Sequence, residues 1–127
     1  MKKVHFKNIL IGFAFSPNLK ANVFEAMRLA NFFDGNLFFL HVGEKTVAKE
    51  KTFLEILRNS PVNPKQINVL WEEGQPDKTI LAQCTLHRID LLLLGALQRE
   101  NMVKFYLGSI ARKITRKAPC SVLLLMK

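Results

Sequence analysis

The chain has no apolar run long enough to span a membrane. Its hydrophobic blocks are the size of strands, whereas a membrane-spanning helix needs about twenty predominantly apolar residues. Residues 1–6 include basic side chains and lead directly into one of these blocks. They are not followed by the hydrophobic region and cleavage site of a secretory signal. We therefore expect a cytoplasmic protein that does not insert into membranes.

Cysteine is scarce, which limits the kinds of site that the chain can build. The two cysteines, Cys84 and Cys120, lie far apart in the sequence, and there is no CxxC motif or Cys/His cluster. This pattern argues against a zinc site. We interpret both as small buried side chains, because free cysteine is among the most buried residue types.

Familiar catalytic motifs are also missing. The sequence contains no GxxxxGK[ST] loop, no serine-glycine-glycine phosphate loop and no Ser-His-Asp or Cys-His arrangement. We interpret Asp77 as a first-turn helix charge and Asp90 as a strand-start residue, so no acid is clearly placed for Mg²⁺. We expect no enzymatic activity, or at most weak ATP hydrolysis.

Acidic residues are few relative to basic ones. Nineteen Lys and Arg residues against ten Asp and Glu give a net charge of +9, which attracts anions as a class. Arg112, Lys113, Arg116 and Lys117 form a basic helix face, but no nucleic-acid motif or aromatic stacking pattern accompanies them. A solvated face is the favoured interpretation, and a basic nucleic-acid-associated protein is kept as an alternative.

What the chain does have is a regular alternation of strand and helix patterns. Its 127 residues, 49% of them hydrophobic, suffice for one domain spanning residues 1–127. Strands that are apolar on both faces and alternate with helices predict an open, five-stranded parallel α/β sheet with helices on both faces. The predicted strands are 8–13, 36–42, 67–72, 91–94 and 121–126, and the predicted helices are about 19–33, 44–59, 76–88 and 108–117.

Two helix ends carry specific signals. Ser16 is a plausible cap for the first helix, with Pro17 in its first turn. Asp34 and Gly35 are expected to stop the same helix.

The most informative segment runs from the strand Asp90–Gly95, through a long basic loop, to Gly108 and Ser109 at a helix start. Unpaired N–H groups at a helix start, with glycines that allow close approach, describe a possible anion site. Arg99 and Lys104 in the loop either meet phosphate oxygens or are only solvated.

The place of this site follows from the fold class. In parallel α/β sheets, ligands bind beyond the carboxyl ends of the strands where the strand order reverses. If the first and fourth strands are neighbours, the crevice lies between residues 14–16 and 95–98. His41, at the end of the second strand, is then either a structural hydrogen-bonding residue or a pocket wall.

Together these residues resemble the universal stress protein family over nearly the full length of the chain. The resemblance is carried by the order and spacing of segments, namely residues 8–11 with 16–17, residues 40–42, residues 73–76 with 80–81 and 90–95, and residues 108–109 with 118–123. It implies the strand order 3-2-1-4-5 of adenine-nucleotide alpha-hydrolase-like, Rossmann-like folds. It also implies a homodimer through strand five, Ser121 to Met126, which would hide an apolar edge.

Members of this family that bind ATP carry a motif of glycine, two residues, glycine, nine residues, glycine, then serine or threonine. Gly95, Gly108 and Ser109 match it, but Gln98 replaces the second glycine, and a side chain there narrows the space for phosphate. Ala14 stands where binders tend to carry an aspartate. Ile110 follows Ser109, where many binders place a second small hydroxyl residue.

The resemblance therefore implies a homodimeric regulatory module with a degenerate adenine-nucleotide site and weak or no ATP binding. No cofactor is required, and ATP or AMP is the candidate ligand. The alternative is a functional binder in which Gly95, Gly108 and Ser109 hold the phosphates and Val42 and Ala14 line the base. The candidate site residues are Ala14, Val42, Gly95, Gln98, Arg99, Gly108 and Ser109.

Overall fold

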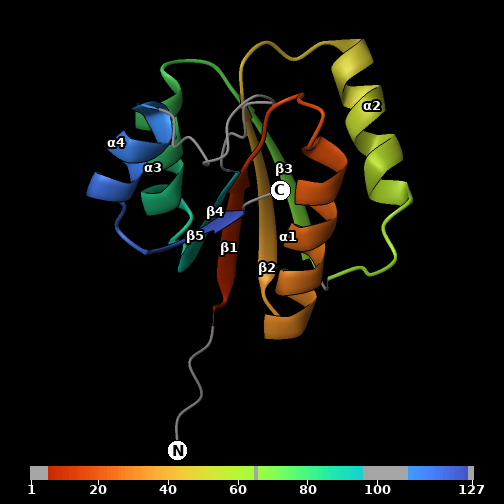
Figure 1. The fold of residues 1–127 in the computed structure, drawn as a ribbon, viewed down its shortest axis with the longest axis horizontal. Helices are drawn as coiled ribbons and strands as arrows, with labels where there is room; N and C mark the ends of the chain where they lie inside the picture. The colour runs from red at the N-terminus through yellow and green to blue at the C-terminus, as the bar shows by residue number, and fades with distance from the viewer. Residues whose placement is uncertain (1–5, 65, 96–108, 126–127) are drawn as a thin grey trace, which may run out of the picture.

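The computed structural model describes residues 6–64, 66–95 and 109–125 (Figure 1). Helices and strands alternate through them in the order β1 Asn8–Gly12, α1 Leu19–Phe33, β2 Asn36–Val42, α2 Val47–Arg58, β3 Gln66–Glu72, α3 Pro76–Leu86, β4 Leu91–Gly95, α4 Ser109–Lys117 and β5 Ser121–Leu125. Of the helices in these ranges, none has the length and hydropathy of a membrane span.

The five strands form one parallel sheet in the order β3-β2-β1-β4-β5. The strand order reverses at β1, which pairs with β2 on one side and with β4 on the other. Figure 1 shows α1 and α2 on one face of the sheet and α3 and α4 on the opposite face. The predicted fold class and the order 3-2-1-4-5 are both confirmed.

The sheet has a hydrophobic core on each face. Alternate residues of β1 supply the two sides, with Ile9 and Ile11 in the cluster beneath α1 and α2, and Leu10 in the cluster beneath α3 and α4. All three side chains are fully buried. Successive strand residues point to opposite faces, so a central strand with helices on both sides must be apolar throughout.

The cap residue of α1 differs from the prediction. The helix begins at Leu19 with Asn18 at the cap position, and the Asn18 side chain makes no capping hydrogen bond. Ser16 is not the cap, because it lies in the preceding turn, where its carbonyl accepts the Leu19 N–H at 3.1 Å. At the other end, Asp34 takes the left-handed conformation (φ 55°), and Gly35 leaves room for the Phe6 carbonyl, which would lie 2.5 Å from an added Cβ.

Two further helix boundaries are corrected. α2 begins at Val47, three residues later than predicted, because the Thr46 hydroxyl accepts the Lys49 N–H at 3.1 Å and caps the helix there. α3 ends at Leu86, before the predicted end near Arg88, which has a positive φ of 52°. Met126, predicted to end strand five, lies outside the described residues.

Asp90 joins the amino ends of the central strands. Its carboxylate accepts the backbone N–H groups of Lys7 at 3.0 Å and of Asn8 at 2.9 Å, and its own N–H donates to the Asn8 carbonyl at 2.8 Å. These contacts lie at the edge of the sheet opposite the carboxyl ends. The interpretation of Asp90 as a strand-start residue is confirmed.

Candidate functional site

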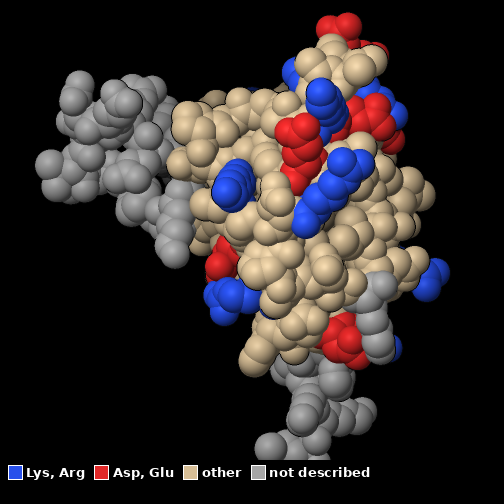
Figure 2. Space-filling view, turned by 90° about the vertical axis from the view of Figure 1, so that its right-hand side faces the viewer, with Lys and Arg blue, Asp and Glu red and all other residues tan. Residues whose placement is uncertain are grey.

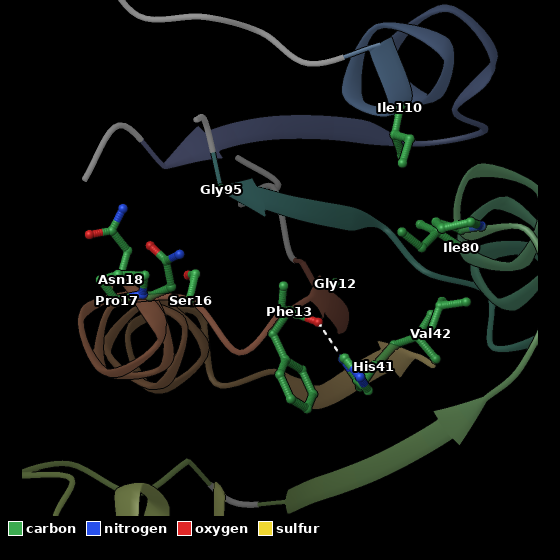
Figure 3. A pocket seen from close by; sticks show the side chains of 14 residues that line it. Gly12, Phe13, Ser16, Pro17, Asn18, His41, Val42, Ile80, Gly95 and Ile110 are labelled. Atoms are coloured by element: carbon green, nitrogen blue, oxygen red, sulfur yellow. Dashed lines mark hydrogen bonds between the residues drawn. The ribbon is translucent and has the colours of Figure 1, made fainter. Parts of the chain in front are cut away.

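A pocket of about 600 Å³ opens at the carboxyl ends of the central strands (Figure 3). It is lined by the ends of β1, β2 and β4 and by the starts of α1, α3 and α4. This is the point where the strand order reverses, the place at which open α/β sheets bind ligands. Its volume falls within the range of about 300–1,000 Å³ found for small-molecule sites.

The structure places the candidate residues unevenly. Ala14, Val42 and Gly95 line the pocket together, as the predicted crevice requires. Ser109 is exposed and does not line it, whereas the next residue, Ile110, does. The remaining candidates, Gln98, Arg99 and Gly108, and also Lys104, lie outside the described residues.

The two halves of the pocket differ in chemistry. Ser16 and Asn18, at the turn into α1, lie on one side in Figure 3, and Val42, Ile80 and Ile110 lie on the other. Asn22 also lines the pocket from α1. Among the described lining residues there is no carboxylate, ammonium or guanidinium group. The described walls therefore offer amide and hydroxyl groups to a ligand, but no counter-charge.

Gly95 has a packing role beside any role in binding. A Cβ at this position would lie 2.9 Å from the Asn22 amide nitrogen, so a side chain at residue 95 would require the Asn22 side chain of α1 to move. Gly12 is similarly placed, with 3.2 Å between an added Cβ and Ile80 Cδ1. Both glycines line the pocket, so a side chain at either position would take up space there.

His41 forms part of the pocket wall and is hydrogen-bonded to the backbone. It is 8% exposed, and its Nδ1 lies 2.9 Å from the Phe13 carbonyl oxygen. Because a carbonyl oxygen only accepts, Nδ1 carries the proton and donates. Both alternatives offered by the sequence therefore hold, since His41 makes a structural hydrogen bond and also lines the pocket.

An aromatic cluster supports this wall from below. Phe13 stacks on Phe53 with ring centroids 4.5 Å apart, and Trp71 meets His41 edge-on at 5.4 Å. Phe15 stacks on Trp71 at 6.1 Å, with the Lys49 ammonium 5.7 Å from its centroid. This cluster was not predicted from the sequence. Its available signal was an aromatic residue or histidine at the end of each of the first three strands.

Neither cysteine points to metal or thiol chemistry. Burial raises the pKa of the Cys84 thiol to about 12, with the adjacent Cys120 contributing, so the thiol stays protonated at neutral pH. Cys84 is buried and Cys120 is partly buried against the same apolar cluster. Within the described ranges, no group of three or more metal-ligating side chains comes together.

A profile of the universal stress protein family matches residues 49–125, which is more than half of the chain. The chain belongs to the universal stress protein family. A search of curated proteins finds no match.

Solved structures of other universal stress proteins share the fold. The universal stress protein UspA from Lactobacillus plantarum is 23% identical, with a TM-score of 0.74, and the match covers 98% of this chain and 100% of that one. A universal stress protein solved in complex with cAMP is 16% identical, with a TM-score of 0.77 and coverages of 96% and 98%. A universal stress protein from Archaeoglobus fulgidus in complex with dAMP is 17% identical, with a TM-score of 0.65 and coverages of 95% and 98%.

Proposed function

We propose that this universal stress protein is a cytoplasmic, homodimeric regulatory module without enzymatic activity, whose adenine-nucleotide pocket binds ATP weakly or not at all. The observation that carries the proposal is the start of α4. There the side chain that lines the pocket is the apolar Ile110, while Ser109 is exposed and does not line it.

Weak ATP binding follows from the chemistry of a triphosphate. Several negative charges must exchange water for protein groups, which is unfavourable unless cations or several N–H donors replace the water. The described walls carry no cation, and Ile110 presents methyl and methylene groups at the helix start. The glutamine at position 98 of the motif also removes the freedom that a glycine would provide.

A single phosphate is a better match, and AMP is therefore a second candidate ligand. The cavity of about 600 Å³ accommodates a mononucleotide. Its aliphatic half, with Val42 and Ile80, suits a purine ring, and Asn18 and Asn22 can bond to ribose or phosphate oxygens. The related proteins solved with cAMP and dAMP support an adenine mononucleotide as the ligand class.

Homodimerisation is proposed through β5. In the described sheet, β5 pairs with β4 on one side, and Leu123 has 40% of its surface exposed. An apolar edge strand is a natural template for pairing with a second chain. A twofold axis at this edge would cover Leu123 with its own copy.

Binding calorimetry on the full chain with ATP and with AMP tests the proposal. We expect an ATP dissociation constant of about 1 mM or weaker, which corresponds to about −4 kcal/mol, and tighter binding of AMP. A micromolar ATP constant would contradict the degenerate site, and absence of AMP binding at millimolar concentration would remove the second candidate. The rate at which ATP releases phosphate should be the same with the protein as in buffer alone. A faster release with the protein would contradict the non-enzymatic assignment.

A further inference from the structure

Helix α4 has the most one-sided charge of the described helices. It carries Arg112, Lys113, Arg116 and Lys117, all exposed, and it contains no acidic residue. Successive helix residues turn by about 100°, so Arg112 and Arg116 lie opposite the buried Ile114 and face away from the sheet.

The helix dipole accounts for only part of this pattern. Arg116 and Lys117 lie in the last turn, where the partial negative charge of the helix end favours cations. Arg112 and Lys113 lie in the first half, where the dipole gives no such benefit. Each of them also has a second cation four residues further on, which disfavours the helix. The helix dipole therefore does not explain why positions 112 and 113 carry cations.

Helix α3 extends the same surface. It lies beside α4 on the same face of the sheet, and both helices run from the carboxyl edge back to the amino edge (Figure 1). Lys78 is exposed in its first turn, and Leu86 in its last turn has 68% of its surface exposed. We call the set Lys78, Leu86, Arg112, Lys113, Arg116 and Lys117 the cationic surface.

The opposite face of the molecule has a different charge pattern. Seen from the side of α1 and α2, acidic and basic side chains lie next to each other (Figure 2). Two ion pairs lie there, Arg28 with Glu25 and Lys45 with Glu50. The positive excess of the described helices is therefore concentrated on α4.

We propose that the cationic surface binds the anionic headgroups of a lipid bilayer, with Leu86 entering the interface. Exposed cations on α4 and an exposed leucine on the neighbouring helix α3 match a surface that attracts anionic lipid and inserts a small apolar group. Nucleic acid is a poorer match, because the described residues of α3 and α4 include no aromatic ring to stack on bases. This inference is independent of nucleotide binding.

Co-sedimentation of the full chain with vesicles tests it. The vesicles are phosphatidylcholine alone, or phosphatidylcholine with about a third phosphatidylglycerol. We expect binding to the anionic vesicles only, and a loss of at least about tenfold in partitioning for K113E/R116E, since each basic residue near an anionic surface contributes roughly fivefold. Leu86→Ser should lower partitioning severalfold without changing the charge.

The matched control is K51E/R58E on α2, which changes net charge equally and also replaces an arginine in a last helical turn. It should keep partitioning within about twofold of the wild type.

If K113E/R116E fails to fold by circular dichroism, K113Q/R116Q replaces it. The proposal is overturned if the wild type ignores anionic lipid or if both double variants lose binding equally. It is also overturned if duplex DNA displaces the protein from the vesicles and if K113E/R116E weakens DNA binding more than it weakens vesicle binding.

Discussion

At the scale of single residues, one contact decides how the pocket wall is oriented. The Phe13 carbonyl accepts the His41 Nδ1–H at 2.9 Å, which determines the tautomer and turns the ring edge toward Gly43, where an added Cβ would lie 2.9 Å from Nε2. The imidazole is thus a structural part of the pocket wall.

Ile110 is the pocket residue that we expect to weaken ATP binding most directly. Ile110→Ser should raise ATP affinity by roughly fivefold or more, because one hydrogen bond to a charged group contributes about 1.5–3 kcal/mol and an apolar side chain leaves the pocket. Calorimetry with ATP measures the change. Val47→Ser, at an exposed aliphatic residue of α2 outside the pocket, should leave the affinity unchanged. Equal affinity in wild type and Ile110→Ser would show that position 110 does not limit binding.

Asp90 is expected to matter for stability instead. Asp90→Ala leaves the Lys7 and Asn8 N–H groups without the carboxylate that accepts them, so the free energy of unfolding should fall by roughly 2–3 kcal/mol. Urea denaturation followed by circular dichroism measures it. Asp77→Ala, which removes an acidic residue of the first turn of α3, should cost less than about 1 kcal/mol. If Asp90→Ala also lowered the free energy of unfolding by less than about 1 kcal/mol, the structural role of Asp90 would be contradicted.

At the scale of elements, β5 is an edge strand that pairs only with β4 among the described residues. β5 alternates exposed and partly buried residues before the buried Leu125, whereas β4 next to it is buried at Leu91–Leu94. Leu123 pairs with Leu93 on the inner side of the ladder. The outer side of the strand is the surface that a second copy would cover.

If the protein dimerises through β5 as proposed, Leu123→Asp should be monomeric, because two carboxylates would meet at a twofold interface without counter-charge. Sedimentation equilibrium of wild type and variant measures the mass. Val47→Asp places the same charge on an 85% exposed residue at the start of α2 and should stay dimeric. A monomeric wild type, or a dimeric Leu123→Asp that is folded by circular dichroism, would refute pairing through β5.

At the scale of the whole molecule, the two faces of the sheet differ in charge, and the pocket lies at the carboxyl edge between them. The ends of β1, β2 and β4 hold the pocket, the α1 and α2 layer carries compensated charge (Figure 2), and α4 carries the positive excess. The aromatic cluster connects the pocket wall to β3 and α2, since Phe13 touches both Phe53 and Trp71.

This connection makes the single tryptophan a reporter of the pocket. The ring centroids of Trp71 and His41 are 5.4 Å apart, and His41 lines the cavity. A ligand in the cavity should therefore change the Trp71 emission by altering the packing and polarity around the indole. A fluorescence titration with AMP should give the dissociation constant that calorimetry gives. In Trp71→Phe the optical signal should vanish while the calorimetric binding remains. Unchanged emission on saturation with AMP would place the ligand elsewhere.

Local patterns in the sequence predicted much of the secondary structure and the parallel sheet. Both faces of a central strand such as Ile9–Ile11 must be apolar when helices cover them, so fully apolar blocks indicated a parallel sheet. The cap residue of α1 was wrongly predicted because a turn at Ser16 precedes Asn18, and serine and asparagine are both favoured at helix caps. The start of α2 was missed because charged residues before Thr46 suit a helix and a loop equally.

The amino-acid sequence by itself determined the class of fold, the alternation of elements and the carboxyl edge as the place for a site, because these follow from residue periodicity and from the geometry of parallel strands. Only the tertiary structure decided that Ile110 lines the pocket and Ser109 does not, that Asn22 packs against Gly95, and that Trp71 lies beside His41. Such contacts join segments far apart in the chain, and their geometry depends on how helices and strands pack, which no local pattern encodes.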